Sequence, residues 1–316
     1  MAARKPPPPH HAVKNAHDLS TLRGGLAIIT GGAAGIGYAL AEAALAHGLH
    51  AVLADVDGDG LKAAEAKLRE GAANGLEVFG HVTDVSSEAS VQALARAVSE
   101  RFPGQRVSLL CCNAGASGGN ILTSPSAVWD RAFGINVFGV AHCIRHFVPG
   151  MIRQRVPGSV VLTASQDGVC ASQGIYGASK HANVALGEGL FQELQGRLSV
   201  HVLCPHVTAT DVFTGGVLKD GSASEREKAG SLYIKSGFQK FGSPPSKMAD
   251  MVFSAIQSGS FYVFGENDRE PGFVRLQAET RMKAMLGDGL PRRPNSTIFA
   301  QVFSPPKKKD APPSRL

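Results

Sequence analysis

Short apolar runs alternate with longer amphipathic segments along most of the chain. The apolar runs predict strands at 25–32, 50–57, 76–86, 106–115, 158–166 and 198–207. The amphipathic segments predict helices at 33–48, 59–72, 87–102, 127–154 and 175–196. Because the apolar runs are continuous, we expect helices to cover both faces of the strands. The pattern therefore predicts an α/β fold with one doubly wound parallel sheet.

The two ends of the chain differ from this pattern. Residues 1–18 are rich in Pro and His, which predicts a disordered tail, and residues 292–316 are expected to be a flexible one. A single domain is expected at 19–291, where a strand and a helix at 261–291 form a short C-terminal extension. No run approaches the roughly 20 apolar residues that cross a bilayer, and the first basic residues lack the apolar core of a secretory signal.

The net charge of +6 is concentrated at the ends of the chain. Residues 1–5 and 305–316 together carry five of these positive charges, which leaves +1 for residues 6–304. A body without a basic excess has no surface that follows a phosphate backbone, so we expect no nucleic-acid binding.

The five cysteines are odd in number and form no CxxC pair, and two of them are adjacent in an apolar run. We expect reduced thiols in the core of a protein from a reducing compartment. No group of His and Cys has ligand spacing, so no metal site is expected. The cysteines are Cys111, Cys112, Cys143, Cys170 and Cys204.

A glycine-rich turn, TGGAAGIG at 30–37, joins the first predicted strand to the first predicted helix. Gly31, Gly35 and Gly37 permit a tight turn and let backbone amides approach a pyrophosphate at the positive end of the helix. A purely structural turn is the alternative.

Asp55 ends the second predicted strand, where an acid can accept hydrogen bonds from the ribose hydroxyls of a dinucleotide. Its charge would repel a 2′-phosphate, and no Arg or Lys directly follows it. We therefore expect NAD rather than NADP. The alternative is an Asp that only shapes the turn at the strand end.

Tyr176 and Lys180 are four residues apart in IYGASKHANVAL, at 175–186, so both side chains are expected on one helix face. An ammonium beside a phenol favours the phenolate and lowers the pKa from its usual value of about 10. Tyr176 would then serve as an acid or base near neutral pH. The alternative is a helix surface that carries both residues by chance.

These features resemble the short-chain dehydrogenase/reductase family, with its TGxxxGIG and YxxxK motifs. The matching stretches follow one another in family order across about 19–270. They are TGGAAGIG at 30–37, DV at 84–85, NAG at 113–115, Asn136 in GINVFG, Ser165 in VVLTASQ, and YGASK at 176–180. The resemblance implies a Rossmann-type fold and an oxidoreductase.

The resemblance also implies a role for each member of a catalytic set. Tyr176 would exchange a proton with the substrate oxygen, and Lys180 would lower the pKa of Tyr176 and bond the nicotinamide ribose. Ser165 would hold the substrate oxygen, and Asn136 would place a water that links Lys180 to solvent.

The cofactor-binding residues follow from the same resemblance. Asp84 and Val85 would meet the adenine, Thr210 would bond the nicotinamide carboxamide, and NAG would line the cleft. The full expected set is Gly31, Gly35, Ile36, Gly37, Asp55, Asp84, Val85, Asn113, Ala114, Gly115, Tyr176, Lys180 and Thr210.

The chain departs from the family pattern at two places. Ser165 precedes Tyr176 by 11 residues rather than the more usual 13, so Thr163 is the fallback for the catalytic hydroxyl. His206 stands where the family often has Gly after the sixth strand. It could narrow the site, join proton transfer or cap a loop, and the last is favoured.

Residues 211–245 correspond to the family's mobile substrate lid, and their apolar side chains predict a greasy substrate. Those side chains are Phe213, Leu218, Leu232, Tyr233, Ile234 and Phe238. We expect hydride transfer between NAD(H) and a medium-sized, apolar secondary alcohol or ketone, a lipid or acyl metabolite among the candidates. A non-catalytic NAD-binding redox sensor or scaffold is the alternative.

The last three residues, Ser314, Arg315 and Leu316, are similar to the SKL signal that a peroxisomal import receptor reads. We therefore expect the peroxisomal matrix, with the cytoplasm as the alternative. By resemblance, the long helix at 126–153 and the helix at 174–195 are expected to form a homodimer or homotetramer.

Overall fold

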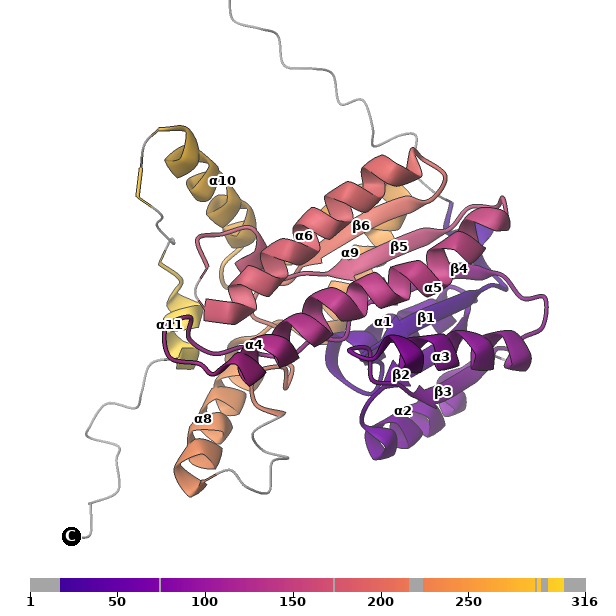
Figure 1. Cartoon of the computed structure of the whole chain (residues 1–316), viewed down its shortest axis with the longest axis horizontal. Coiled ribbons are helices and arrows are strands. Elements are labelled where there is room, and N and C mark those ends of the chain that lie inside the picture. Colours follow the sequence, from indigo (N-terminus) through magenta and orange to yellow (C-terminus); the bar gives the residue numbers. More distant parts are fainter. Residues whose placement is uncertain are drawn as a thin grey trace, which may run out of the picture.

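The computed structural model describes residues 18–303, except for 74, 173, 216–223, 288 and 291–294 (Figure 1). One seven-stranded parallel sheet has the order β3-β2-β1-β4-β5-β6-β7. The strands are β1 (Leu26–Thr30), β2 (His50–Asp55), β3 (Val78–Val82), β4 (Val107–Cys112), β5 (Ser159–Thr163), β6 (Ser199–Cys204) and β7 (Tyr262–Phe264). The predicted doubly wound α/β fold is confirmed.

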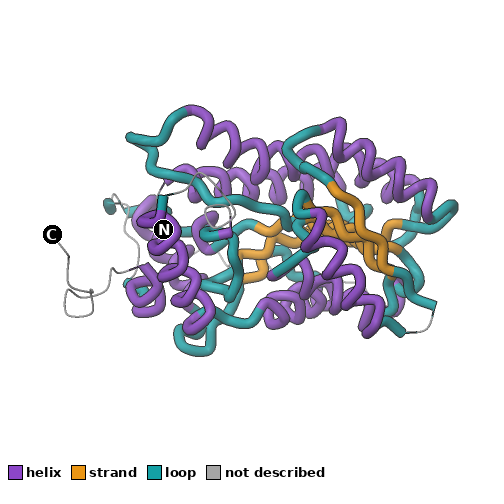
Figure 2. Tube along the Cα trace, turned by 90° about the horizontal axis from the view of Figure 1, so that it is seen from below, coloured by secondary structure: helices purple, strands orange, loops and turns teal. Residues whose placement is uncertain are grey.

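Helices lie on both sides of the sheet (Figure 2). The helices are α1 (Gly35–Ala46), α2 (Gly58–Gly71), α3 (Glu88–Arg101), α4 (Ser126–Phe133), α5 (Gly139–Arg153), α6 (Gly174–Leu194), α8 (Glu225–Phe241), α9 (Pro245–Ser258), α10 (Phe273–Leu286) and α11 (Thr297–Phe303). Short turns of 3-10 helix lie at η2 (Leu19–Leu22) and η4 (Gln166–Gly168), and a π-helical segment lies at η3 (Gly134–Phe138).

Buried strands explain the continuous apolar runs of the sequence. In β1, Ala27 and Ile29 pack with residues of α1, α2 and α9, while Leu26 and Ile28 pack with α3, α5 and α6. Successive side chains of a strand point to opposite faces, so a strand covered on both faces must be apolar at every position.

The predicted long helix at 127–154 is a single helical run with a change of winding in its middle. It consists of α4, η3 and α5 in direct succession, with Asn136 in the π-helical turn. Such turns insert one extra residue into the hydrogen-bond ladder and often occur at functional sites. In this chain the turn carries one of the predicted site residues.

The prediction of a flexible tail from residue 292 is wrong for the described residues 295–303. Residues 297–303 form α11, in which Ile298 and Val302 are buried. The pattern also did not indicate α9, and residues 225–241 of the expected lid form the regular helix α8. The helices α9 and α11 are stabilised by packing of their buried apolar side chains, which the local sequence pattern does not encode.

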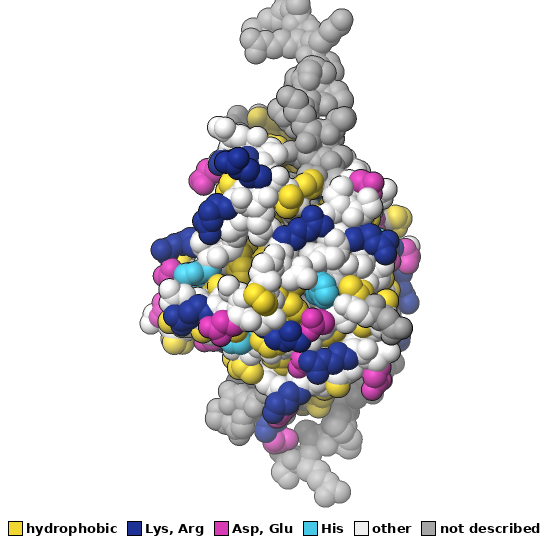
Figure 3. All heavy atoms as spheres, turned by 90° about the vertical axis from the view of Figure 1, so that its right-hand side faces the viewer, with side chains coloured by type: hydrophobic (Ala, Val, Ile, Leu, Met, Phe, Trp, Pro, Cys, Tyr) yellow, Lys and Arg dark blue, Asp and Glu magenta, His cyan; other side chains and the backbone are white. Residues whose placement is uncertain are grey.

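The surface of the protein carries charges of both signs, and its cysteine side chains lie in the core. On the face that Figure 3 shows, Lys and Arg side chains lie among Asp and Glu side chains. All five cysteines are buried thiols, as predicted. Within the described residues, no helix combines the length and the apolar character that a membrane span requires, and no cluster of three acidic, His or Cys side chains offers a metal site.

The first 17 residues of the predicted N-terminal tail lie outside the described residues, and so does the terminal tripeptide Ser314–Leu316. The expected homodimer or homotetramer stays a prediction as well.

Candidate active site

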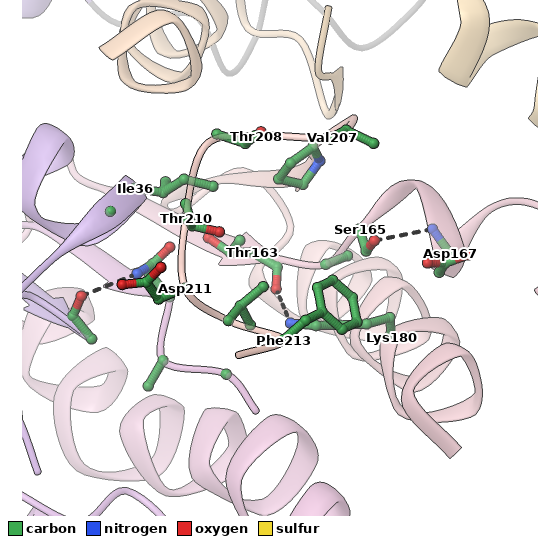
Figure 4. A pocket seen from close by; sticks show the side chains of 18 of the residues that line it. Ile36, Thr163, Ser165, Asp167, Lys180, Val207, Thr208, Thr210, Asp211 and Phe213 are labelled. Atoms are coloured by element: carbon green, nitrogen blue, oxygen red, sulfur yellow. Dashed lines mark hydrogen bonds between the residues drawn. The ribbon is translucent and has the colours of Figure 1, made fainter. Parts of the chain in front are cut away.

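A cavity of about 250 Å³ opens at the carboxyl ends of β1, β4, β5 and β6, where the strand order reverses. Ser165, Asp167 and Lys180 lie on one side of it, and Ile36, Thr210 and Asp211 on the other (Figure 4). The predicted site residues that line it are Gly31, Gly35, Ile36, Asp55, Asn113, Ala114, Gly115, Ser165, Tyr176, Lys180 and Thr210. Four predicted residues, all in the described part of the chain, do not line it: Gly37, Asp84, Val85 and Asn136.

The glycine turn packs closely against the end of β4. Gly31 has a φ of +67°, and a Cβ there would lie 3.0 Å from the Cα of Ala114. A Cβ on Gly37 would lie 1.9 Å from the carbonyl oxygen of Gly31, so neither position accepts a larger residue. Ala34 provides no side-chain cap for α1. The turn thus leaves the amides at the start of α1 for an anionic ligand.

Asp55 is held beside this turn by backbone amides. Its Oδ2 atom accepts a hydrogen bond from Ala33 N (3.0 Å), and its Oδ1 atom accepts one from Asp57 N (3.0 Å). Each carboxylate oxygen can accept more than one hydrogen bond. Asp55 therefore lines the cavity with a fixed negative charge that can receive hydroxyl groups.

Asn113 ties β4 to β1. Its side-chain amide donates to the Thr30 carbonyl (3.1 Å), and its backbone N–H donates to the Thr30 hydroxyl (2.9 Å). Ala114 N donates to the same hydroxyl (3.0 Å). The NAG stretch is thus a rigid wall of the cavity.

Asp84 and Val85 lie in the loop after β3. The Asp84 carboxylate accepts hydrogen bonds from the backbone N–H (2.9 Å) and the hydroxyl (2.7 Å) of Ser86. Val85 is buried, and its carbonyl lies 3.0 Å from His142 Nδ1. Their contact with an adenine ring stays a prediction.

Tyr176 and Lys180 lie on one face of α6 and both line the cavity. The ammonium of Lys180 donates to the backbone carbonyl of Thr163 (2.8 Å) and lies 5.7 Å from the centre of the Tyr176 ring. Gly115 leaves room for this ammonium, since a Cβ at Gly115 would lie 3.3 Å from it.

Burial dominates the ionisation of this pair. It raises the pKa of Tyr176, the nearby Asp167 carboxylate raises it further, and a hydrogen bond with Ser165 opposes the change. Burial lowers the pKa of Lys180 to about 8, against a smaller opposing effect of Cys204. The prediction of a lowered Tyr176 pKa is therefore wrong for this structure, because burial and the Asp167 carboxylate outweigh the hydrogen bond with Ser165.

Asn136 is buried, and its side chain connects three elements. Its Oδ1 atom accepts from Ala116 N (2.8 Å), while its Nδ2 atom donates to Ala116 O (2.9 Å) and to the Ser179 hydroxyl (2.9 Å). These bonds join the π-helical turn to α6 and to the loop after β4. The side chain braces the site, and the water that Asn136 would place stays a prediction.

Ser165 follows β5 at the edge of the cavity. Its hydroxyl accepts a hydrogen bond from Asp167 N (3.1 Å) and interacts with Tyr176, whereas Thr163 offers its carbonyl to Lys180. This arrangement favours Ser165 over Thr163 as the substrate-facing hydroxyl.

Asp167 and His206 line the cavity but were not among the predicted catalytic and cofactor-binding residues. Asp167 lies in η4, two positions after the strand-end serine, and is buried. His206 accepts a hydrogen bond from Val207 N at Nδ1 (2.6 Å), and its Nε2 lies 3.2 Å from Glu270 Oε2. The ring of His206 thus caps the loop after β6 and lines the cavity. The acid that orients it lies 64 positions along the chain, so no local signal marks it.

Phe213 and Phe238 form the apolar end of the cavity. The ring of Phe213 meets that of Tyr176 edge-on, with the ring centres 5.0 Å apart. Both phenylalanines belong to the predicted set of substrate contacts, and their positions agree with that prediction.

Three other described side chains of the predicted lid set, Leu232, Tyr233 and Ile234, do not line the cavity. Leu232 is 56% exposed and Tyr233 is 37% exposed on α8. Their expected contact with substrate stays a prediction. Ile234 packs against the cluster that contains Phe238. Leu218 lies outside the described residues.

Known proteins are similar to this chain in sequence and in fold. The family model described as short chain dehydrogenase matches residues 25–217. The chain is 30% identical to a CLA biosynthesis dehydrogenase/reductase of Lactiplantibacillus plantarum, over 83% of this chain and 93% of that protein. It is 33% identical to 1-deoxy-11-beta-hydroxypentalenate dehydrogenase of Streptomyces avermitilis, over 77% of this chain and 85% of that protein.

A solved short-chain dehydrogenase/reductase from Burkholderia phymatum, in complex with NAD, has the same fold with a TM-score of 0.76 and 34% identity. The match covers 87% of this chain and 99% of that one. Sequence, fold and the cavity residues lead to the same assignment. The chain belongs to the short-chain dehydrogenase/reductase family, oxidoreductases that act on hydroxyl and keto groups with a nicotinamide cofactor.

Proposed function

We propose that this protein transfers a hydride between NAD(H) and a medium-sized, apolar secondary alcohol or ketone. The observation that carries the proposal is the meeting of Ser165, Tyr176 and Lys180 in one cavity with the glycine turn and Asp55. An alcohol dehydrogenase needs proton-transferring side chains next to a dinucleotide-binding turn, and this cavity contains both.

The residues at the glycine end fit a dinucleotide. Gly31 and Gly35 would hold the pyrophosphate at the uncapped start of α1. Asp55 would accept the ribose hydroxyls, and its charge disfavours the 2′-phosphate of NADP. The similar Burkholderia protein was solved in complex with NAD, which supports a nicotinamide dinucleotide at this site.

The bound nicotinamide would accept or supply the hydride. Tyr176 would hold the substrate oxygen and carry its proton, with Ser165 as a second hydrogen-bond partner on that oxygen. Because burial keeps the Tyr176 phenol protonated, it is ready to donate its proton to a ketone oxygen. The Lys180 ammonium, fixed by Thr163, would stabilise the phenolate that remains.

The far end of the cavity favours an apolar substrate. Val207, Phe213 and Phe238 line it, and they leave few hydrogen-bond partners for a sugar. Asp167 adds one buried acceptor near Tyr176. A substrate with one carbinol or carbonyl group and an apolar body fits this lining.

The test follows NADH absorbance with purified protein and a panel of 2-butanol, 2-octanol, 1-phenylethanol and 3-hydroxyacyl compounds, alongside NADH fluorescence for binding. We expect turnover with NAD and the larger apolar alcohols. Cofactor binding without turnover of any compound would overturn the proposal and support a non-catalytic NAD-binding sensor or scaffold.

A further inference from the structure

The carboxylate of Glu270, in the loop before α10, joins two separate parts of the molecule. Its Oε1 atom accepts hydrogen bonds from Thr297 N (2.6 Å), the Thr297 hydroxyl (2.7 Å) and Ile298 N (3.2 Å). Its Oε2 atom accepts from the Ser296 hydroxyl (2.7 Å) and lies 3.2 Å from His206 Nε2. One carboxylate thus contacts both the start of α11 and the wall of the cavity.

These contacts need the anionic form of Glu270. Burial by itself would raise its pKa, but the hydrogen bonds from Ser296, Thr297 and Ile298 together lower it. A carboxylate offers acceptors on both oxygens, whereas the amide of a glutamine would turn an N–H group toward one set of these donors.

His206 takes its orientation from the same carboxylate. Its side chain is only 1% exposed, Val207 N donates to its Nδ1, and its Nε2 points to Glu270. The ring also meets Phe273 edge-on, with the ring centres 5.4 Å apart. The His206 part of the cavity wall therefore depends on where the Glu270 carboxylate lies.

Glu270 accepts hydrogen bonds from the N-terminal end of α11, and this helix packs against α8 of the predicted lid. Ile298 and Val302 of α11 are buried in one cluster with Val207 and Phe238. A Cβ on Gly237 of α8 would lie 3.0 Å from the Cα of Val302, so the two helices approach closely there (Figure 1).

An aromatic chain leads from α11 to the predicted catalytic tyrosine. The ring of Phe303 lies edge-on to that of Phe213, with the centres 6.0 Å apart. Phe213 in turn lies 5.0 Å from Tyr176, again edge-on. The position of α11 therefore affects the position of Phe213, the apolar side chain that packs against Tyr176 in the cavity.

We propose that Glu270 is a positioning residue that couples His206 to α11 and so holds Phe213 over Tyr176. This coupling sets the affinity for apolar substrates while the hydride-transfer and proton-transfer groups stay in place. The proposal rests on the function proposed above for its kinetic part, and its structural part can be measured without turnover.

The test compares Glu270→Gln with Glu279→Gln, an exposed charge change on α10. Hydrogen exchange of the full-length protein would report on residues 297–303. We expect these amides to exchange about tenfold faster or more in Glu270→Gln, because charge-assisted hydrogen bonds are lost. The Glu279→Gln variant should exchange like the wild type.

Kinetics with NAD and 2-octanol supply the second measurement. We expect KM for the alcohol to rise severalfold in Glu270→Gln, with kcat within about twofold and the NADH affinity unchanged. A merely structural role would lower the melting temperature without this split between KM and kcat. If the wild type turns over no alcohol, the proposed function fails, and hydrogen exchange alone decides the coupling.

A milder double variant, Ser296→Ala with Thr297→Val, removes two hydroxyl donors and keeps Glu270 and His206. It should accelerate exchange at 297–303 in the same direction, and it serves as the test if Glu270→Gln does not fold. Unchanged exchange in the variant that folds would overturn the proposal. A fall in kcat with an unchanged KM would overturn it too.

Discussion

The ammonium of Lys180 is anchored 2.8 Å from the backbone carbonyl of Thr163. The bond joins α6 to the end of β5, so the helix that carries Tyr176 and the strand that leads to Ser165 are held in one geometry. Lys180 thus positions both parts of the proton-transfer set in addition to carrying charge.

Tyr176→Phe removes one hydroxyl oxygen and keeps the ring that packs against Phe213. Turnover should fall by about 10²–10⁴-fold, because that oxygen is the proposed proton carrier. The melting temperature and NADH affinity should stay near those of the wild type. Tyr233→Phe is the matched control, since Tyr233 lies on the exposed side of α8. Near wild-type turnover in Tyr176→Phe would mean that the pairing with Lys180 has no catalytic purpose.

The lowered pKa of Lys180 should make the free energy of unfolding depend on pH. Its folded pKa of about 8 lies below the ordinary 10.5, so between these values the unfolded chain binds more protons. The contribution of Lys180 to the free energy of unfolding therefore rises with pH between these two pKa values, by roughly 1.4 kcal/mol per pH unit at most.

Lys180→Met should abolish this rise, which urea unfolding at pH 7.5 to 9.5 would measure as a difference from the wild type. The comparison cancels the contributions of groups common to both proteins, and the range ends below the ordinary pKa of tyrosine, about 10. Lys62→Met, at an exposed position of α2, is the control. Parallel pH profiles of Lys180→Met and the wild type would contradict the lowered pKa.

Asp55→Asn keeps the size of the side chain and removes its charge. The affinity for NAD should fall by tenfold or more, since charge-assisted hydrogen bonds to the ribose contribute about 1.5–3 kcal/mol. Discrimination against NADP should also weaken, because the repulsion of the 2′-phosphate is lost. Asp59→Asn, fully exposed on α2, should change neither value. A wild-type protein that already prefers NADP would show that the NAD assignment is wrong.

Phe213→Ala should raise KM for apolar alcohols, because the ring lines the cavity and covers Tyr176. An increase of tenfold or more corresponds to the roughly 1.5–3 kcal/mol of a buried large apolar side chain. Leu232→Ala should leave KM unchanged, since Leu232 faces solvent. Steady-state kinetics with 2-octanol would measure both variants, and equal effects would contradict the division of the lid into a cavity side and a solvent side.

Much of this architecture could be predicted from the order of residues alone. The alternation of apolar and amphipathic segments determined the doubly wound sheet, because a strand buried on both faces and a helix buried on one need different periods. Gly31 and Gly37 marked the turn at α1 for a local reason as well, since no Cβ fits there. The four-residue spacing of Tyr176 and Lys180 placed them on one helix face.

Only the tertiary structure decided the ionisation of Tyr176, the helix at 297–303 and the role of Glu270. The pKa of Tyr176 depends on its burial and on Asp167, which the spacing to Lys180 does not report. Glu270 meets His206 across 64 positions of sequence, and α11 exists because Ile298 and Val302 find a buried cluster. Local pattern encodes period and backbone freedom, whereas hydration and distant pairing arise only when the chain is folded.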